Sequence, residues 1–149
     1  MSIVEAICIS SNKGVAKGPI PEAEFIAEWG IAEDAHGGRW HRQVSMLSAE
    51  SIDLMRNRIP DLSKGAFAEN IITRGLDLSQ IRIGDIVRIG SDIILEVTQL
   101  GKECHEACEI GRSTGACIMP IEGIFARVLH GGSARPGDSI SIGANSTNQ

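Results

Sequence analysis

Short apolar blocks, separated by polar breaks rich in Gly, follow one another along most of the chain. Blocks of this length that are rich in Ile and Val are typical of β-strands. The predicted strands lie within residues 3–9, 44–47, 65–73, 81–90, 93–98 and 139–142. Gly84-Asp85 is a turn signal, so residues 81–90 are predicted to form two short alternating segments.

One segment has helical spacing instead. Ser48 is a good N-cap, and Pro60 ends the segment. Between them the apolar side chains recur at helical intervals: Ile52, Met55 and Ile59. A second short helix is predicted over 121–129, and residues 21–24 begin either a short helix or a covered loop.

The order of these elements favours a mostly-β architecture. Many short strands, about 8–12 residues apart and joined by Gly-containing turns, predict a β-barrel that carries one or two short helices. With 149 residues, the chain has room for one core, so we expect a single domain over 1–149.

Composition removes several functional classes. The formal net charge is −5 and there is no Tyr, which argues against nucleic-acid binding because that relies on basic patches and aromatic platforms. No apolar run approaches the roughly 20 residues that span a bilayer, and the first residues lack a secretory signal. We therefore expect a cytoplasmic protein without a membrane partner.

Residues 30–43 form the densest polar stretch of the chain. It contains Asp34, two histidines (His36 and His41), two arginines (Arg39 and Arg42) and the pair Gly37-Gly38. Such a stretch between apolar segments is either a solvated loop or a binding site. The histidines are then loop side chains or site groups, and Asp34 caps a turn, pairs with Arg42 or contacts a ligand.

The four cysteines fall into two groups. Cys8 lies inside the first predicted strand, where a cysteine acts as a small hydrophobic residue. The others cluster as Cys104-His105-x-x-Cys108 and Cys117. This cluster is a structural zinc site, or it contains a reactive thiolate at Cys104 beside Lys102; a disulfide framework is disfavoured in a reducing compartment.

An ordered series of motifs resembles the MOSC domain, the family named after the C-terminal domain of molybdenum cofactor sulfurases. The series comprises Asp34-x-His36-x-x-x-x-His41-Arg42-Gln43-Val44-Ser45, Phe67-x-Glu69-Asn70-Ile71, Ile83-Gly84-Asp85, Glu96-Val97-Thr98-Gln99 with Cys104, and Arg135-Pro136-Gly137-Asp138. The resemblance is to the small stand-alone bacterial form and covers about residues 30–143, with 144–149 a frayed tail.

The resemblance implies a barrel like that of the pyruvate kinase barrel domain and one key cysteine, Cys104. This residue would carry sulfur as a persulfide or ligate molybdenum in the pterin-based molybdenum cofactor (molybdopterin). The predicted cofactor-binding residues are Asp34, His36, Arg39, His41, Arg42, Glu69, Asn70 and Lys102. Glu69-Asn70 could equally be a turn pair.

Three functions therefore stay open. The first is cofactor binding or sulfur transfer, with a pyridoxal-phosphate cysteine desulfurase or a molybdoenzyme as partner; the pyridoxal phosphate would belong to that partner. The second is a cofactor-dependent oxidoreductase that reduces N-hydroxylated compounds. The third is a non-catalytic barrel with structural zinc.

Overall fold

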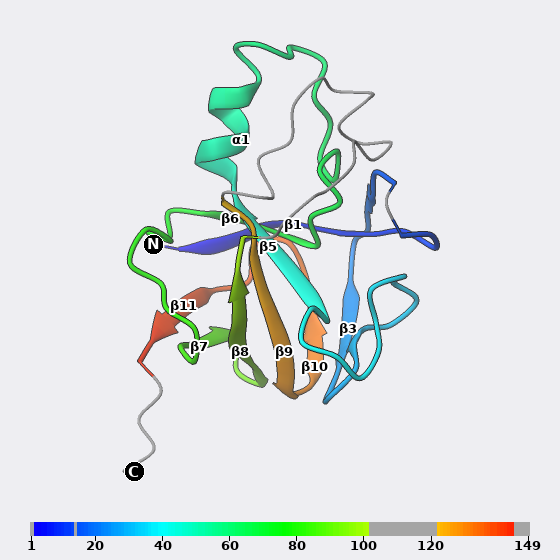
Figure 1. Ribbon diagram of the computed structural model, residues 1–149, viewed down its shortest axis with the longest axis vertical. Coiled ribbons are helices and arrows are strands. Elements are labelled where there is room, and N and C mark those ends of the chain that lie inside the picture. Colours follow the sequence, from blue (N-terminus) through cyan, green and yellow to red (C-terminus); the bar gives the residue numbers. More distant parts are fainter. Residues whose placement is uncertain (1, 14, 102–121, 145–149) are drawn as a thin grey trace.

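The computed structural model describes residues 2–13, 15–101 and 122–144. Those residues form a mostly-β structure with one helix (Figure 1). The elements are β1 (Ile3–Ile9), β2 (Gly18–Pro19), β3 (Ala23–Ile26), β4 (Gly30–Ile31), β5 (Val44–Ser48), α1 (Ala49–Met55), β6 (Ile71–Arg74), β7 (Ile86–Ile89), β8 (Ile93–Leu100), β9 (Ile124–His130), β10 (Gly132–Ala134) and β11 (Ile140–Gly143). None of the described helices is long and apolar enough to cross a membrane.

The main sheet is curved into a barrel-like shape. Its eight strands lie in the order β11-β7-β8-β9-β5-β6-β1-β2, and a small sheet of β10, β3 and β4 lies beside β9 (Figure 1). The start of β1 returns to the other end of the sheet, where Val4 N donates to the Asp138 carbonyl at 2.8 Å. A bridge between Ile3 and Ser139 joins the same two segments. The predicted barrel-like fold is confirmed.

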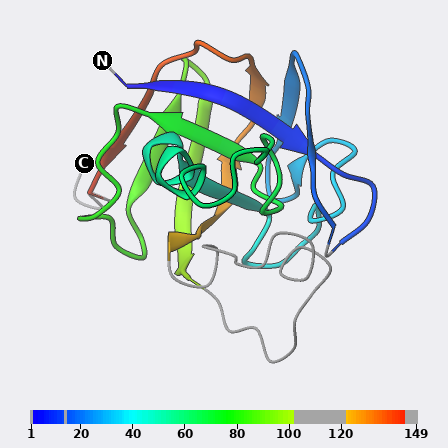
Figure 2. The same cartoon turned by 90° about the horizontal axis from the view of Figure 1, so that it is seen from above.

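Alternation along the strands produces two cores. In β8 the side chains of Ile93, Leu95 and Val97 are buried inside the barrel, while the residues between them are partly exposed. A second core, which includes Leu47, Ile52 and Phe67, fills the space between the sheet and α1. Seen from above, α1 lies over the region of β1 and β6 (Figure 2).

The helix begins where the sequence predicts. Ser48 has extended backbone and its hydroxyl accepts a hydrogen bond from Ser51 N, so the N-cap is confirmed. The regular helix ends at Met55, before the predicted end at Pro60. Residues 56–59 continue as turns whose amides bond back to carbonyls of the helix.

The predicted helix over 121–129 is wrong, and so is the helical one of the two alternatives for residues 21–24. Most of the segment 121–129 forms the strand β9, which pairs with β5 on one side and with β8 on the other. Its apolar run fits either a strand or a buried helix, and the central position in the sheet decides the outcome. The region 21–24 leads into the strand β3 instead of a helix.

The block 81–90 is also simpler than predicted. Only Ile86–Ile89 is a strand, β7. Residues 82–85 form a turn in which the Asp85 carboxylate accepts the Arg82 amide at 2.9 Å, and Gly84 has φ +96°, which favours glycine. Asp85 is thus a turn residue.

Candidate functional site

Residues 32–43 connect β4 to β5 and carry most of the predicted site residues. The loop is packed against Trp29: Gly38 N donates to the Trp29 carbonyl at 2.8 Å. A Cβ atom on Gly37 would lie only 2.5 Å from the indole nitrogen of Trp29. The absence of a side chain at Gly37 therefore allows the loop to pack closely against Trp29.

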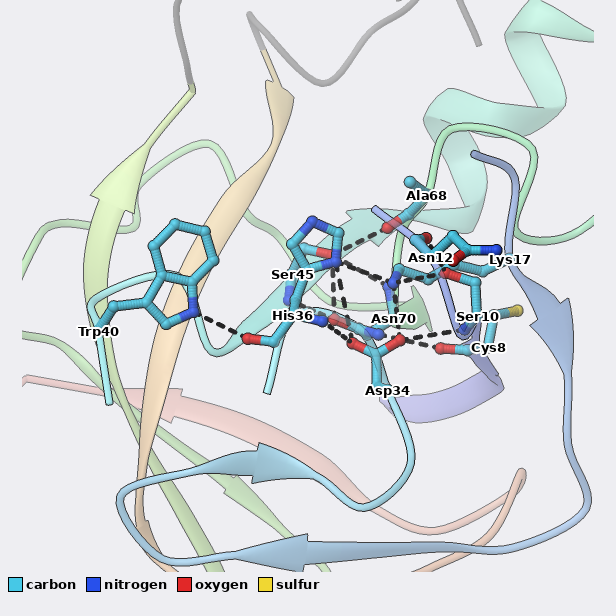
Figure 3. Close-up of polar contacts among 10 residues, drawn as sticks. All are labelled: Cys8, Ser10, Asn12, Lys17, Asp34, His36, Trp40, Ser45, Ala68 and Asn70. Carbon is cyan, nitrogen blue, oxygen red and sulfur yellow. Dashed lines mark hydrogen bonds and ion pairs between the residues drawn. The ribbon is translucent and has the colours of Figure 1, made fainter. Parts of the chain in front are cut away.

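Asp34 is the centre of a buried polar cluster (Figure 3). Its side chain has 0% exposure, and one carboxylate oxygen accepts from Lys17 Nζ at 2.7 Å and from Ser10 N at 3.1 Å. The other oxygen accepts the amide of His36 at 3.2 Å, so Asp34 also caps its own loop. The predicted pairing of Asp34 with Arg42 is wrong, since the partner is Lys17. We call Ser10, Lys17, Asp34 and His36 the Asp34 cluster.

Lys17 lies between β1 and β2 and reaches this cluster from a different part of the chain. Its ammonium contacts three groups: Asp34 Oδ1, His36 Nδ1 at 2.9 Å and Ser10 Oγ at 3.3 Å. Burial lowers the pKa of Lys17 from 10.5, and the hydrogen bond and charge of Asp34 act in the opposite direction. An ammonium group has three protons to donate, and Lys17 has three acceptors within reach, so each of its protons has a partner.

Trp40 fixes the outer side of His36. The two rings are stacked with an interplanar angle of 3° and centroids 6.3 Å apart. The indole N–H donates to the His36 carbonyl at 2.8 Å (Figure 3). The ring and backbone of His36 are therefore both held, and its side chain is 20% exposed.

Arg42 has an aromatic environment and no carboxylate partner among the described residues. Its guanidinium carbon lies 5.6 Å from the ring of Trp40 and 5.6 Å from that of Phe125. Its Nε is buried and has no hydrogen-bond partner in the described part of the chain. Lys13 Nζ lies 4.7 Å from the Trp40 ring, so two cations flank this indole. By contrast, Arg127 on β9 pairs with Glu28 and Glu96.

His41 joins the loop to the end of β8. Its Nε2 lies 2.8 Å from Gln99 Oε1, and its carbonyl accepts from the hydroxyl of Thr98. The Gln99 amide in turn donates to the Gly101 carbonyl at 2.6 Å. These bonds hold the loop beside the last described residues of this strand segment.

Glu69 and Asn70 are fully buried and face the backbone. The two carboxylate oxygens of Glu69 accept the amides of Gly65 and Phe67 at 3.1 and 2.9 Å, and burial raises the pKa of this carboxyl. Asn70 accepts from Ser45 N at 3.0 Å and donates to the Cys8 carbonyl at 3.0 Å, so it joins β1 to β5. We call Cys8, Ser45, Glu69 and Asn70 the Asn70 cluster.

Cys8 is a core residue, as predicted. Its side chain is fully buried, and burial raises the pKa of its thiol to about 12, so the nucleophilic thiolate is disfavoured. The cluster Cys104, His105, Cys108 and Cys117, together with Lys102, lies outside the described residues. Among the described residues, no group of three or more His, Cys, Asp or Glu side chains could hold a metal ion.

A cavity of about 480 Å³ lies next to the start of α1, and none of the residues of the Asp34 cluster lines it. Its floor includes Leu76, Leu78 and Ile81, and three carboxylates line it: Glu50, Asp77 and Glu122. Each of these carboxylates accepts a hydrogen bond from a neighbouring amide or hydroxyl. This acidic cavity contrasts with the cations that surround Trp40.

The sequence did not point to Lys17, Lys13 or Gln99. Lys17 is separated from Asp34 by 17 positions in a polar segment, and nothing in its neighbours indicates burial. Gln99 could have been found, because it belongs to the Glu96–Gln99 motif that precedes Cys104. Lys13 and Phe125 become relevant only once the fold brings them to Trp40 and Arg42.

The model of the MOSC domain family matches residues 33–141. The chain belongs to this family. The match includes the loop 33–43 and β5 to β9, whereas Ser10 and Lys17 of the Asp34 cluster lie before it.

Relatives of known structure share the fold. The YuaD protein from Bacillus subtilis superimposes with a TM-score of 0.78 at 20% identity, covering 95% of this chain and 96% of its own. YiiM from Geobacillus stearothermophilus gives a TM-score of 0.73 at 18% identity, covering 99% of this chain and 78% of its own. A protein of Gibberella moniliformis (strain M3125 / FGSC 7600) named "Reductase" is 33% identical over an alignment of 130 residues, which covers 79% of this chain and 23% of that protein. The chain thus spans about a quarter of its length.

Proposed function

We propose that the chain binds the molybdenum cofactor, or carries sulfur for its metabolism, through the loop 34–43 and Cys104. The observation that carries this proposal is the guanidinium of Arg42, which lies 5.6 Å from each of two aromatic rings and whose buried Nε has no hydrogen-bond partner among the described residues. An arginine without a carboxylate at a partly buried position is suited to an anionic group that comes from outside the chain.

The donor set fits the anionic part of this cofactor. Arg42 and Lys13 flank Trp40, and Arg39 is exposed on the same loop. Among the described residues, Arg42 forms no ion pair with a carboxylate, and its Nε has no partner. These cations would hold the phosphate, His36 and His41 would offer polar contacts to the pterin, and Lys102 is proposed to join them.

Cys104 follows Gly101 by three positions in the sequence. Three residues of chain span at most about 10 Å, and Gly101 is tied through Gln99 to His41. A cysteine thiolate is a soft ligand that suits molybdenum or accepts a sulfur atom as a persulfide. When bound, the cofactor would supply redox chemistry at the metal.

Metal content tests cofactor binding. The protein is purified from a host that makes the molybdenum cofactor and from one that does not, and molybdenum and pterin are quantified per chain. We expect both only from the first host, with strong loss in Cys104→Ser and Arg42→Met. Arg88→Met is the matched control, because this exposed arginine on β7 is separated from β5 by β8 and β9. Equal molybdenum content in Arg42→Met, Arg88→Met and wild type would contradict the proposed site.

Sulfur transfer is tested with the proposed partner. Incubation with a pyridoxal-phosphate cysteine desulfurase and cysteine should add the mass of one sulfur atom, and a thiol reductant should remove it. Cys104→Ser should abolish the gain, whereas Cys8→Ser should not. A gain that survives Cys104→Ser would exclude this residue as the carrier. We place this transfer in the cytoplasm, where thiols stay reduced.

A second candidate is reduction of N-hydroxylated compounds by the cofactor-loaded chain. It is favoured by the Gibberella relative named "Reductase", which is 33% identical over 130 residues. The loaded protein is tested with a chemical electron donor and an N-hydroxylated substrate, with the cofactor-free protein as control. Equal rates for loaded and cofactor-free protein would rule out this activity.

A further inference from the structure

Lys17 contacts His36 in a way that restricts which ring nitrogen carries a proton. Lys17 Nζ lies 2.9 Å from His36 Nδ1, and it also lies 2.7 Å from the Asp34 carboxylate. An ammonium can donate but cannot accept a hydrogen bond. Its partner nitrogen on the imidazole must therefore be an acceptor without a proton.

The surroundings keep Lys17 in its ammonium form. The side chains of Lys17 and Asp34 have 0% exposure, so neither ion has water to replace its partner. Removing the proton from Lys17 would leave the Asp34 carboxylate buried without its counter-charge, which is costly in a low-dielectric interior. The two remaining acceptors, Ser10 Oγ and His36 Nδ1, complete the shell of the ammonium.

We propose that Lys17 is a positioning residue of the candidate site, which fixes neutral His36 as the Nε2–H tautomer. The proton on Nε2 makes that nitrogen a donor, so whatever faces it must be an acceptor such as a phosphate oxygen or a carbonyl. The same proton prevents Nε2 from ligating a metal ion. The role of His36 toward a ligand is thereby set by a lysine of the preceding segment.

The other contacts of His36 support a fixed orientation. Its amide donates to Asp34 at 3.2 Å, its carbonyl accepts from Trp40, and its ring stacks on the indole. Lys17 is itself held by its backbone, because its amide donates to the Gly65 carbonyl at 2.8 Å. Both ends of the contact between Lys17 and His36 are thus anchored (Figure 3).

The tautomer is measured directly in the cofactor-free protein. Long-range nitrogen–proton NMR of the imidazole rings distinguishes protonated from unprotonated nitrogens, and His36→Gln assigns the signals among the four histidines. At pH values where His36 is neutral we expect Nδ1 to be unprotonated and Nε2 to be protonated. A wild-type spectrum with the proton on Nδ1 overturns the proposal, even if no variant folds.

Variants test the role of Lys17. Lys17→Met should replace the single tautomer by a mixture, and Lys17→Met combined with Asp34→Asn tests the same point without an unpaired buried carboxylate. Lys64→Met is the control, because this lysine is exposed and lies outside the Asp34 cluster. An unchanged His36 spectrum in both Lys17 variants would overturn the proposal.

The effect of Lys17 on cofactor binding rests on the proposed function, and it is measured separately from the tautomer, as the molybdenum content of the purified protein. Lys17→Met should lower the molybdenum content of the purified protein about tenfold, the effect of one hydrogen bond to a ligand. If the tautomer becomes mixed and molybdenum content does not change, Lys17 has no role in the site although the proposed function stands. If wild type binds no cofactor, the proposed function fails while the tautomer assignment is still decided by the spectrum.

Discussion

The Asp34 cluster and the Asn70 cluster are both buried, both contain an acidic residue, and both come from motifs of the same family. They differ in what their polar atoms face. The Glu69 side chain accepts hydrogen bonds from the backbone amides of Gly65 and Phe67. The Asn70 side chain accepts from the Ser45 amide and donates to the Cys8 carbonyl. The Asp34 cluster instead joins charged side chains and ends at His36, which is 20% exposed.

This difference separates the structural role of the Asn70 cluster from the binding role that we propose for the surroundings of Asp34. The Asn70 cluster connects β1, β5 and the loop before β6, so its loss should affect folding first. On the outer side of the Asp34 cluster, His36 stacks on Trp40, and Arg42 lies near the same indole. These three side chains are the ones that we propose to contact a ligand. A buried acidic residue in a motif therefore indicates a binding site only where its network reaches the surface.

The largest expected effect on stability comes from breaking the buried ion pair between Lys17 and Asp34. Asp34→Ala leaves the Lys17 ammonium buried without its counter-charge, so we expect the free energy of unfolding to fall by about 3–5 kcal/mol. Urea denaturation measures it. Lys17→Met with Asp34→Asn removes both charges and should recover part of the loss. A loss below about 1 kcal/mol in Asp34→Ala would show that the pair is not desolvated.

Asn70 comes next. Asn70→Ala leaves the Ser45 amide and the Cys8 carbonyl buried without partners, and we expect a loss of about 2–4 kcal/mol in urea denaturation. Asn70→Asp keeps an acceptor for Ser45 but places an ionisable carboxyl against the Cys8 carbonyl, so it should not recover the loss. If Asn70→Ala were as stable as wild type, the connection between β1 and β5 would not depend on this side chain.

The pH dependence of stability tests whether the pKa of Glu69 is raised in the folded protein. Burial raises its pKa above 4.5, so the folded protein keeps a proton that the unfolded chain has released. Stability should therefore fall as pH rises from 4.5 through the folded-state pKa, with a slope from this group of at most about 1.4 kcal/mol per pH unit.

The contribution of Glu69 is isolated by comparison. Glu69→Gln should remove this part of the slope in urea titrations at several pH values. Asp77→Asn is the control, because the pKa of Asp77 is lowered from 3.8 by its hydrogen bonds to Ser79 and its window lies below that value. Parallel curves for wild type and Glu69→Gln above pH 4.5 would contradict a raised pKa.

The smallest effect concerns Thr73 on β6, whose buried hydroxyl has no hydrogen-bond partner among the residues that the structure describes. Thr73→Val should leave stability unchanged or increase it by up to about 1 kcal/mol, because no hydrogen bond is lost. Thr98→Val is its counterpart and should lower stability by about 0.5–1.5 kcal/mol, since the Thr98 hydroxyl donates to the His41 carbonyl. Thermal melts compare the two, and equal losses would contradict the difference.

Much of the architecture follows from local sequence. The segments 3–9 and 93–98 are short, rich in Ile and Val and bounded by polar residues, which favours strands, and Ser48 gives a local start to the helix. The segment that forms β9 was mistaken for a helix, because a buried central strand has no polar alternation to reveal its period. Its partners β5 and β8 decide its structure.

The sequence predicts which residues belong to the candidate site, but it does not predict which residues they contact. Motifs identified Asp34, His36 and Arg42, yet the partner of Asp34 is Lys17, which no short-range pattern connects to it. The same motifs identified Glu69 and Asn70 without showing that these side chains face the backbone. Direction of a side chain depends on tertiary packing, which a list of motif positions does not contain.

The enclosure of Lys17 gives the folded site a built-in chemical reporter. Reagents that acylate amines need an accessible, unprotonated nitrogen, and Lys17 has 0% side-chain exposure while Lys13 and Lys64 are exposed. Brief acylation followed by peptide mapping should therefore mark Lys13 and Lys64 and spare Lys17. The extent of labelling at this one amine then reports how often the loop around Asp34 opens.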